Sequence, residues 1–449
     1  MVGRKPHHAG GPGGLIPPGR RRHLLHFTLL SIFPEFFDSF LACGLMAKAL
    51  ESGVVTVDRI NPRDFAEDKH HTVDDRPYGG GPGMVMGLPT LCAALRSLPR
   101  PGKVLMLSPA GRRFDQKMAE ELSGEESLTL LCGRYEGIDA RIFELFDIEP
   151  VSVGDFVLSG GESAATCLME AVARLVPGFM GKESSADEES FASGLLEYPH
   201  YTRPEVFEGL PVPPELLSGH HAAIAAWRRR RSLETTLARR PDLFDATCIT
   251  DEDAAYLRTI PRTRAGRNVH IGLIHGPVML KDGSVGTVSL TNLDIHDIAR
   301  VSRTYGLGGF EVVSPLRDQL TLAERIVEHW RTGPGRRANP DRTEALSLVR
   351  LHESLDAALL AVSRDHGQPA TLVATSARGP ATLSFAAARE WIATRPVLVV
   401  LGTGHGLADA ILARADGVLP PLRPFSEYNH LSVRAAAGIL TDRLLGDAL

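Results

Sequence analysis

Two short apolar runs that break into glycine-rich segments constrain what this chain can fold into. The runs Ser127–Cys132 and Pro150–Val153 lead into the segments Gly133–Gly137 and Gly154–Glu162. Short apolar runs bounded by turn residues are typical of buried strands. Glycine at a strand end lets the backbone approach a ligand closely. Since open α/β sheets bind ligands at the carboxyl ends of their strands, these segments predict one ligand cradle; the alternative is two tight turns.

Alternation of strand-like and helix-like segments predicts an α/β fold with mostly parallel sheets. The expected strands, besides the two apolar runs, are Lys103–Leu107, Val269–Ile274, Phe310–Val313, Thr371–Ala374 and Pro396–Leu401. Helices are expected at Phe114–Leu122, Glu162–Leu175 and within Tyr198–Arg258, the last with Ser218 and Asp251 as N-caps. A loop is expected at Gly333–Arg342. This pattern predicts two α/β domains with a helical module between them.

Composition excludes several classes of protein. No apolar run reaches the roughly 18 residues that a membrane span needs, so no membrane partner is expected. The five cysteines are scattered and form no CxxC pair. This favours reduced thiols in the cytoplasm, without a disulfide framework or a zinc site. With a net charge of −5, binding to nucleic acid would depend on local basic patches.

Several long motifs, in the right order, resemble the bacterial tRNA guanine-N1 methyltransferases (TrmD-type), which use S-adenosylmethionine. Besides the glycine-rich segments, the motifs are Ile32–Glu35, Pro62–Phe65, Thr72–Met84, Leu107–Pro109 and Tyr198–Glu205. The resemblance implies methyl transfer to N1 of the guanosine at tRNA position 37, next to the anticodon. It also implies a trefoil-knotted (SPOUT-type) fold and a homodimer with shared active sites. Magnesium is implied as an aid to the reaction, although no metal-ligand cluster is visible in the sequence.

The resemblance also assigns residues to roles. It implies a donor pocket made of Leu107, Ser108, Pro109, Gly133, Tyr135, Glu136, Gly137, Val153, Gly154, Asp155, Phe156, Val157, Leu158, Gly160 and Gly161. Methylation at N1 requires a base for its proton and a cation or N–H donor for the charge that develops at O6. The resemblance implies Arg174 near the guanine; the alternative is a surface helix cation. It implies Glu189 as the base where the family has aspartate, and Asp187 or Glu188 remain alternatives.

The second half resembles a little-studied family of knotted S-adenosylmethionine-dependent RNA methyltransferases, over about residues 268–446. The motifs are Thr291–Arg300, Leu401–Leu407 and Tyr428–Ala437. Because the 401–407 loop leaves the end of a strongly apolar strand, its glycines would allow backbone contact with an adenosine. The donor candidates are Gly402, Thr403, Gly404, Gly406 and Leu407, with Asn429, His430, Leu431 and Ser432 from the segment expected beside them. The first and last of these motifs also look like weaker versions of the ribose 2′-O methyltransferase signatures, in which an asparagine and a helix arginine face the substrate. Asn292 and Arg300 match that spacing; the alternative for Arg300 is a surface ion pair. A non-catalytic RNA-binding module is the alternative for the whole domain. A pair of nucleotide-binding oxidoreductases is disfavoured because Leu407 stands where a dinucleotide fingerprint needs glycine.

The expected division of the chain has six parts. They are a disordered basic arm (1–24), a first knotted domain (25–181), a mobile acidic loop (182–197), a helical tRNA-binding module (198–258), a linker (259–267) and a second knotted domain (268–449). The alternative for the arm is a start codon placed too early. In the helical module, four consecutive arginines (228–231) are expected to contact tRNA phosphates.

Overall fold

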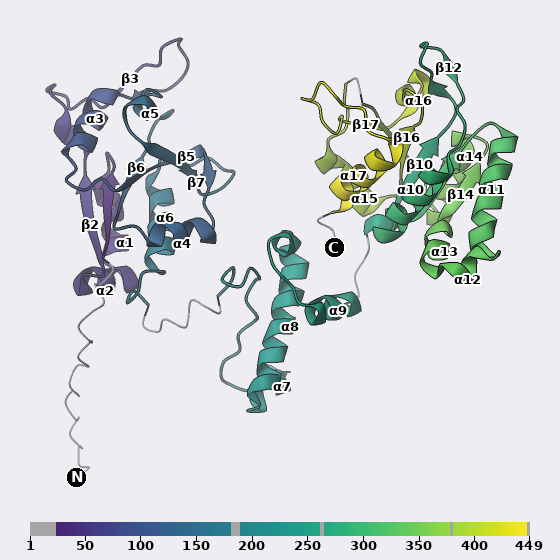
Figure 1. Ribbon diagram of the computed structural model, residues 1–449. Helices are drawn as coiled ribbons and strands as arrows, with labels where there is room; N and C mark the ends of the chain where they lie inside the picture. Colours follow the sequence, from purple (N-terminus) through teal and green to yellow (C-terminus); the bar gives the residue numbers. More distant parts are fainter. Residues whose placement is uncertain (1–23, 181–188, 261–264, 378–379, 447–449) are drawn as a thin grey trace. The chain divides into compact units, whose positions relative to one another are not determined.

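A computed structural model describes residues 24–180, 189–260, 265–377 and 380–446 (Figure 1). Residues 1–23 of the predicted arm, 182–188 of the acidic loop and 261–264 of the linker lie outside the described residues, as do Asp187 and Glu188. The chain divides into two compact units, residues 1–200 and 201–449. No described helix is long and apolar enough to cross a membrane.

A five-stranded sheet forms the centre of the first unit. Its order is β2-β1-β6-β5-β7, and every neighbouring pair is parallel. The strands are β1 (Leu25–Leu30), β2 (Val55–Ile60), β5 (Lys103–Arg113), β6 (Ser127–Cys132) and β7 (Ile148–Ser152). Every residue of β6 is buried, as is usual for a strand inside a parallel sheet covered on both faces. The prediction of a mostly parallel α/β fold is therefore confirmed for this unit.

Helices enclose this sheet and build two apolar cores. One core contains Met46, Met118 and Leu168; the other contains Leu91, Leu95 and Ile142. The helical elements are η1 (Pro34–Phe37), α1 (Asp38–Leu41), α2 (Gly44–Ser52), η2 (Pro62–Phe65), α3 (Leu88–Ser97), α4 (Gln116–Ser123), α5 (Ile142–Leu145) and α6 (Glu162–Ala173). A short hairpin pairs β3 (Asp74–Asp75) with β4 (Val85–Met86).

The predicted all-helical segment also contains a β-hairpin. Its elements are β8 (Val206–Phe207), β9 (Leu210–Pro211), α7 (Pro214–Leu217), α8 (His221–Arg239), η4 (Pro241–Asp245) and α9 (Asp251–Thr259). The predicted N-caps are wrong. The His220 side chain caps α8, and Thr250 caps α9 through a capping box with Asp253. The box moves the cap to Thr250 because two backbone N–H groups gain partners there.

A second parallel sheet, of six strands, forms the centre of residues 265–446. Its order is β14-β13-β10-β16-β15-β17. The strands are β10 (Val269–Ile274), β13 (Gly309–Val313), β14 (Val349–His352), β15 (Thr371–Thr375), β16 (Val397–Gly402) and β17 (Gly417–Leu419). A hairpin of β11 (Val278–Met279) and β12 (Val285–Gly286) follows β10. The predicted parallel α/β arrangement is confirmed here as well.

Helices cover both faces of the second sheet. They are η5 (Ala265–Asn268), α10 (Asn292–Thr304), α11 (Arg317–Arg331), α12 (Gly335–Ala338), α13 (Pro340–Leu346), α14 (Leu355–His366), α15 (Phe385–Thr394), α16 (Asp409–Arg414) and α17 (Val433–Leu445). The predicted loop Gly333–Arg342 is wrong, because α12 and the start of α13 lie within it. Asn339 caps α13 by accepting a hydrogen bond from Arg342 N, and Pro340 suits the first helical position.

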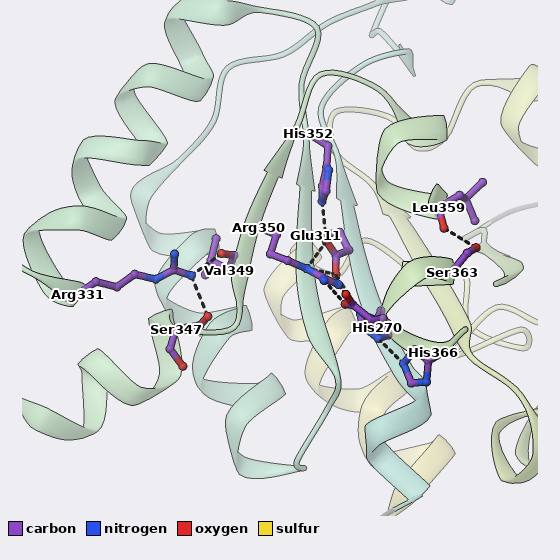
Figure 2. Close-up of polar contacts among 11 residues, drawn as sticks. His270, Glu311, Arg331, Ser347, Val349, Arg350, His352, Leu359, Ser363 and His366 are labelled. Atoms are coloured by element: carbon purple, nitrogen blue, oxygen red, sulfur yellow. Dashed lines mark hydrogen bonds and ion pairs between the residues drawn. The ribbon is translucent and has the colours of Figure 1, made fainter. Parts of the chain in front are cut away.

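One buried carboxylate ties three strands of the second sheet together (Figure 2). Glu311 on β13 is fully buried. Its oxygens lie 3.0 Å from His270 Nδ1 on β10, 3.0 Å from Arg350 Nε and 2.7 Å from His352 Nε2, both on β14. Burial alone would raise the pKa of Glu311, but these hydrogen bonds outweigh it and bring the pKa to about 2. Glu311 is therefore a fixed anion inside the sheet.

Candidate active sites

Three loops of the first unit lie at one edge of the sheet. Leu107 on β5 pairs with Cys132 on one side and Val151 on the other, so the three strands reach the same level. The backbone beyond Leu107 leaves the regular ladder and rejoins it at Arg112. The predicted donor residues lie in this irregular part of β5 and in the segments that follow β6 and β7. The structure therefore gathers them at one edge.

The two glycine-rich segments lie side by side. Gly161 N donates a hydrogen bond of 2.9 Å to Gly133 O, and Arg134 bridges to Gly160. A Cβ atom on Gly161 would lie 2.8 Å from Cys132 Cα, closer than real side chains approach. Glycine is thus required for the two segments to touch. The two segments therefore lie close enough together to form the predicted cradle.

The Thr72–Met84 motif closes one side of this cradle. Glu136 N donates to Met84 O at 3.0 Å, and Met86 N donates to Gly137 O at 2.9 Å. Burial raises the pKa of the Tyr135 phenol, and the neighbouring Asp74 carboxylate raises it further. The structure therefore joins two motifs that are about fifty residues apart in the chain.

A buried ion pair beneath the cradle was missed by sequence reasoning. Glu162, the first residue of α6, is fully buried, and its Oε2 lies 2.9 Å from Arg134 Nη2. Ser31 Oγ donates to the other carboxylate oxygen at 2.6 Å. The Arg134 guanidinium also lies over the Phe33 ring, 4.7 Å from its centre. The sequence signal for this ion pair is an acidic residue, Glu162, that directly follows two glycines at the start of a helix.

Arg174 and Glu189, predicted separately, come together. Arg174 Nη2 lies 2.5 and 2.6 Å from the two Glu189 carboxylate oxygens. Both side chains line a cavity of about 540 Å³ with Phe40, Gln116, Thr166, Cys167, Glu170, Ala171, Leu175, Met180 and Ser190. Arg174 caps the carboxyl end of α6, whereas the donor loops lie at its amino end. Because a helix rises 1.5 Å per residue, the two ends are about 18 Å apart.

The four consecutive arginines of α8 have different surroundings. Arg229 Nη2 lies 2.7 Å from Asp253 Oδ2, and its hydrogen bonds lower the pKa of that buried acid. Arg231 pairs with Glu234 at 2.5 Å. The Arg230 guanidinium is exposed and lies over the Tyr256 ring, 5.2 Å from its centre. The predicted phosphate contact fits Arg230 better than Arg229, whose role is to hold α9 against α8.

In the second α/β region, the predicted loop Gly402–Leu407 is held against the segment after β10. Thr403 N donates to Ile274 O at 3.1 Å, and Met279 N donates to Gly406 O at 2.9 Å. Gly402 turns tightly, since a Cβ atom there would lie 2.3 Å from Leu407 N. Gly406 has a φ of +114°, and a Cβ atom added to it would meet no heavy atom within 4 Å. The loop thus presents open backbone at the carboxyl edge of the sheet.

The other predicted residues of this region lie at two places. Asn429 Nδ2 donates to Ala377 O at 3.2 Å, and Ser432 caps α17. Among described residues, no hydrogen bond joins the segment Asn429–Ser432 to the loop Gly402–Leu407. Asn292 and Arg300 are exposed on α10, two turns apart on one face. Both substrate candidates therefore share a surface.

Comparison with known proteins decides the family. The model of the family described as tRNA (Guanine-1)-methyltransferase TrmD matches residues 25–246. A relative from Oleidesulfovibrio alaskensis is 55% identical and covers 95% of this chain and 100% of its own length. A relative from Nitratidesulfovibrio vulgaris is 56% identical over 94% of this chain and 99% of its own. Both carry the name tRNA (guanine-N(1)-)-methyltransferase.

This chain belongs to the TrmD family. A TrmD relative from Deinococcus deserti, 52% identical, covers only 52% of this chain but 87% of its own length. A second family model, described as SAM-dependent RNA methyltransferase, matches residues 268–446. The chain therefore carries a TrmD part followed by a part of a second methyltransferase family.

Both loops fit the S-adenosylmethionine that the two families imply. Gly137 and Gly406 each have positive φ, and a Cβ atom added to either would meet no heavy atom within 4 Å. Such open glycine backbone can contact an adenosine closely. For magnesium, the described residues contain no group of three or more His, Cys, Asp or Glu side chains that could hold a metal ion. We therefore derive no step through magnesium.

Proposed function

We propose that the first domain methylates N1 of guanosine at tRNA position 37, next to the anticodon, with S-adenosylmethionine as the donor. The observation that carries this proposal is the Arg174–Glu189 pair in its cavity. N1–H and O6 are adjacent on the edge of guanine. A carboxylate beside a guanidinium matches that edge, because one accepts the N1 proton while the other donates to O6.

In the proposed reaction, Arg174 and Glu189 give up their contact with each other and contact the target guanine instead. Glu189 accepts the N1 proton as the N1–methyl bond forms, and Arg174 stabilises the negative charge that develops at O6. When bound, the donor supplies a methyl group on a positively charged sulfur. The loops after β6 and β7 would hold it through backbone contacts and exclude water. Arg134 and Glu162 would keep those loops together from below.

We also propose a homodimer with shared active sites. The supporting observation is the separation of the donor loops from Arg174 by the length of α6, about 18 Å. The cavity with Arg174 and Glu189 is lined by none of the predicted donor residues. A second copy that places its donor loops against this cavity would complete the site. The same proposal includes a SPOUT-type trefoil knot in each α/β domain. It also includes a cytoplasmic location and the six-part division of the chain.

For residues 268–449 we propose a second S-adenosylmethionine-dependent RNA methyltransferase domain of unknown target. The open backbone at Gly406, within the loop Gly402–Leu407, supports donor binding. A non-catalytic RNA-binding module is the second candidate. Calorimetry with the donor distinguishes them: a full-length variant with Gly404→Val should lose one of two donor sites. A single donor site in the unchanged protein would favour the RNA-binding module.

Mass spectrometry of tRNA nucleosides tests the main proposal. Unmodified tRNA with guanosine 3′ of the anticodon should gain 1-methylguanosine when incubated with the full-length protein and the donor. The same tRNA with adenosine at that position should gain none. Methylation of the adenosine-bearing control at the same rate, or of neither tRNA, would contradict the proposed function.

A further inference from the structure

Two arginines and a histidine converge where α10 packs against α13. His296 and Arg300 are one turn apart on α10 and therefore share a face. The Arg342 guanidinium of α13 lies over the Trp330 ring, 4.7 Å from its centre, and the His296 ring meets the same tryptophan at 5.8 Å. Burial lowers the pKa of His296, and the charges of Arg342 and Arg300 lower it further against the opposing charge of Asp297. Both arginines are thus within electrostatic reach of this imidazole.

These arginines have no acidic partner among the described residues. No ion pair joins Arg300 or Arg342 to a carboxylate in that part of the chain. The neighbouring acids serve other cations: Glu344 accepts a hydrogen bond from Arg303 Nε at 2.8 Å, and Asp297 lies 3.6 Å from an arginine of α17. Like charges held together repel each other. Two arginines that converge without a direct ion-pair partner favour a bound anion.

We propose that His296, Arg300 and Arg342 bind backbone phosphates of RNA, and we name these three residues with Asn292 the α10 strip. Asn292, one turn before His296 on the same face, begins α10 at the carboxyl edge of the sheet. The strip extends about 12 Å from there to Arg300. An RNA strand held along it would lead to the edge where Gly402–Leu407 lies. Forked guanidinium groups suit phosphate oxygens.

RNA is favoured over an acidic protein segment because the second family model, which covers this region, is described as an RNA methyltransferase. The inference rests on the proposed RNA-directed role of residues 268–449, but it does not require that this domain be catalytic. Sequence reasoning found Asn292 and Arg300 and missed His296 and Arg342. Arg342 was assigned to a loop, so its proximity to α10 was not predictable.

Salt dependence of RNA binding tests the α10 strip. The probe is a 20-nucleotide oligo(U), which contains no guanosine for the first domain to methylate, bound to the full-length protein. The double variant Arg300→Gln/Arg342→Gln should bind it less tightly. The slope of log affinity against log salt should shrink by about 1.4, because each single-strand phosphate contact contributes about 0.7. Arg342→Lys keeps the charge and should keep the slope while losing affinity.

Arg414→Gln is the control for the loss of an arginine charge, because it removes one such charge from an exposed ion pair with Asp356 in the same sheet domain. It should leave affinity and slope unchanged. Thermal melting checks that each variant folds. An unchanged slope in the folded double variant overturns the proposal. The proposal also fails if polyglutamate binds the protein as tightly as RNA does and this binding is lost in the same variant. Methyl transfer is measured separately, so this test remains valid even if the second domain has no methyltransferase activity.

Discussion

At the scale of single residues, Glu189 carries the most specific prediction. Glu189→Gln keeps the size of the side chain and its contact with Arg174 but removes the proton acceptor. The methylation rate should fall by about 10²–10⁴-fold, and donor affinity should barely change. Single-turnover kinetics on unmodified tRNA measures this. Glu170→Gln, which changes another acid of the same cavity, is the control. A normal rate for Glu189→Gln would transfer the role to Asp187 or Glu188.

His275 predicts a pH dependence of stability. This histidine follows β10, is 1% exposed, and burial lowers its pKa to about 4. The unfolded chain therefore binds the proton first, so stability is full above about pH 6.5 and falls as the pH drops toward 4. The loss should be on the order of 3 kcal/mol at the acid end. Urea unfolding, followed by fluorescence of the tryptophans, which all lie beyond residue 200, measures it.

His275→Asn should flatten this pH dependence. Part of the slope should remain, because burial and the neighbouring His270 also lower the pKa of His366. An equally steep dependence in the variant would show that other groups control the acid response.

At the scale of elements, helix α8 carries one arginine that stabilises the fold and another that we expect to bind tRNA. Arg229→Gln should lower the melting temperature, because Asp253, 6% exposed, would lose its cation. Arg230→Gln should leave melting unchanged but weaken tRNA binding, with a salt slope smaller by roughly 0.7–0.9. Calorimetric melting and filter binding measure the two effects. The opposite assignment, with Arg230 stabilising and Arg229 binding, would refute this division.

The strands show how far local sequence reasoning reaches. Apolar runs such as Ser127–Cys132 predict β6 correctly because burial on both faces selects apolar residues along the whole strand. Strand β14 escaped notice because it carries Arg350 and His352. Both side chains hydrogen-bond to Glu311, which lies about forty residues earlier. A compensating partner on another strand cannot be inferred from the local pattern.

The residues of the candidate sites also divide into those that the sequence predicts and those that only the structure brings together. Arg174 and Glu189 were assigned from motifs, and the structure joins them. The Arg134–Glu162 pair depends on the closeness of two loops, and Arg342 depends on the packing of two helices. Neither arrangement has a spacing that a single sequence displays.

At the scale of the whole molecule, complementation tests the shared active site. Gly137→Val should block one donor loop, because its φ of +137° strains any side chain. Glu189→Gln removes the base. Each variant alone should have at most about one hundredth of the unmodified activity. A heterodimer would have one site with both parts intact, so an equal mixture should recover about a quarter of the unmodified activity. Recovery is measured as 1-methylguanosine after the mixed dimers have exchanged; no recovery would place the whole site within one copy.

The length of α6 has a kinetic consequence. If one chain cannot bring its own donor loops to its own Arg174, a lone chain has no turnover. The total rate should then rise with the square of enzyme concentration when the protein is dilute, and linearly once dimers saturate. Cells would receive little tRNA methylation from the first few copies and much more from each later one. The length of a single helix would thus set a threshold in gene dosage.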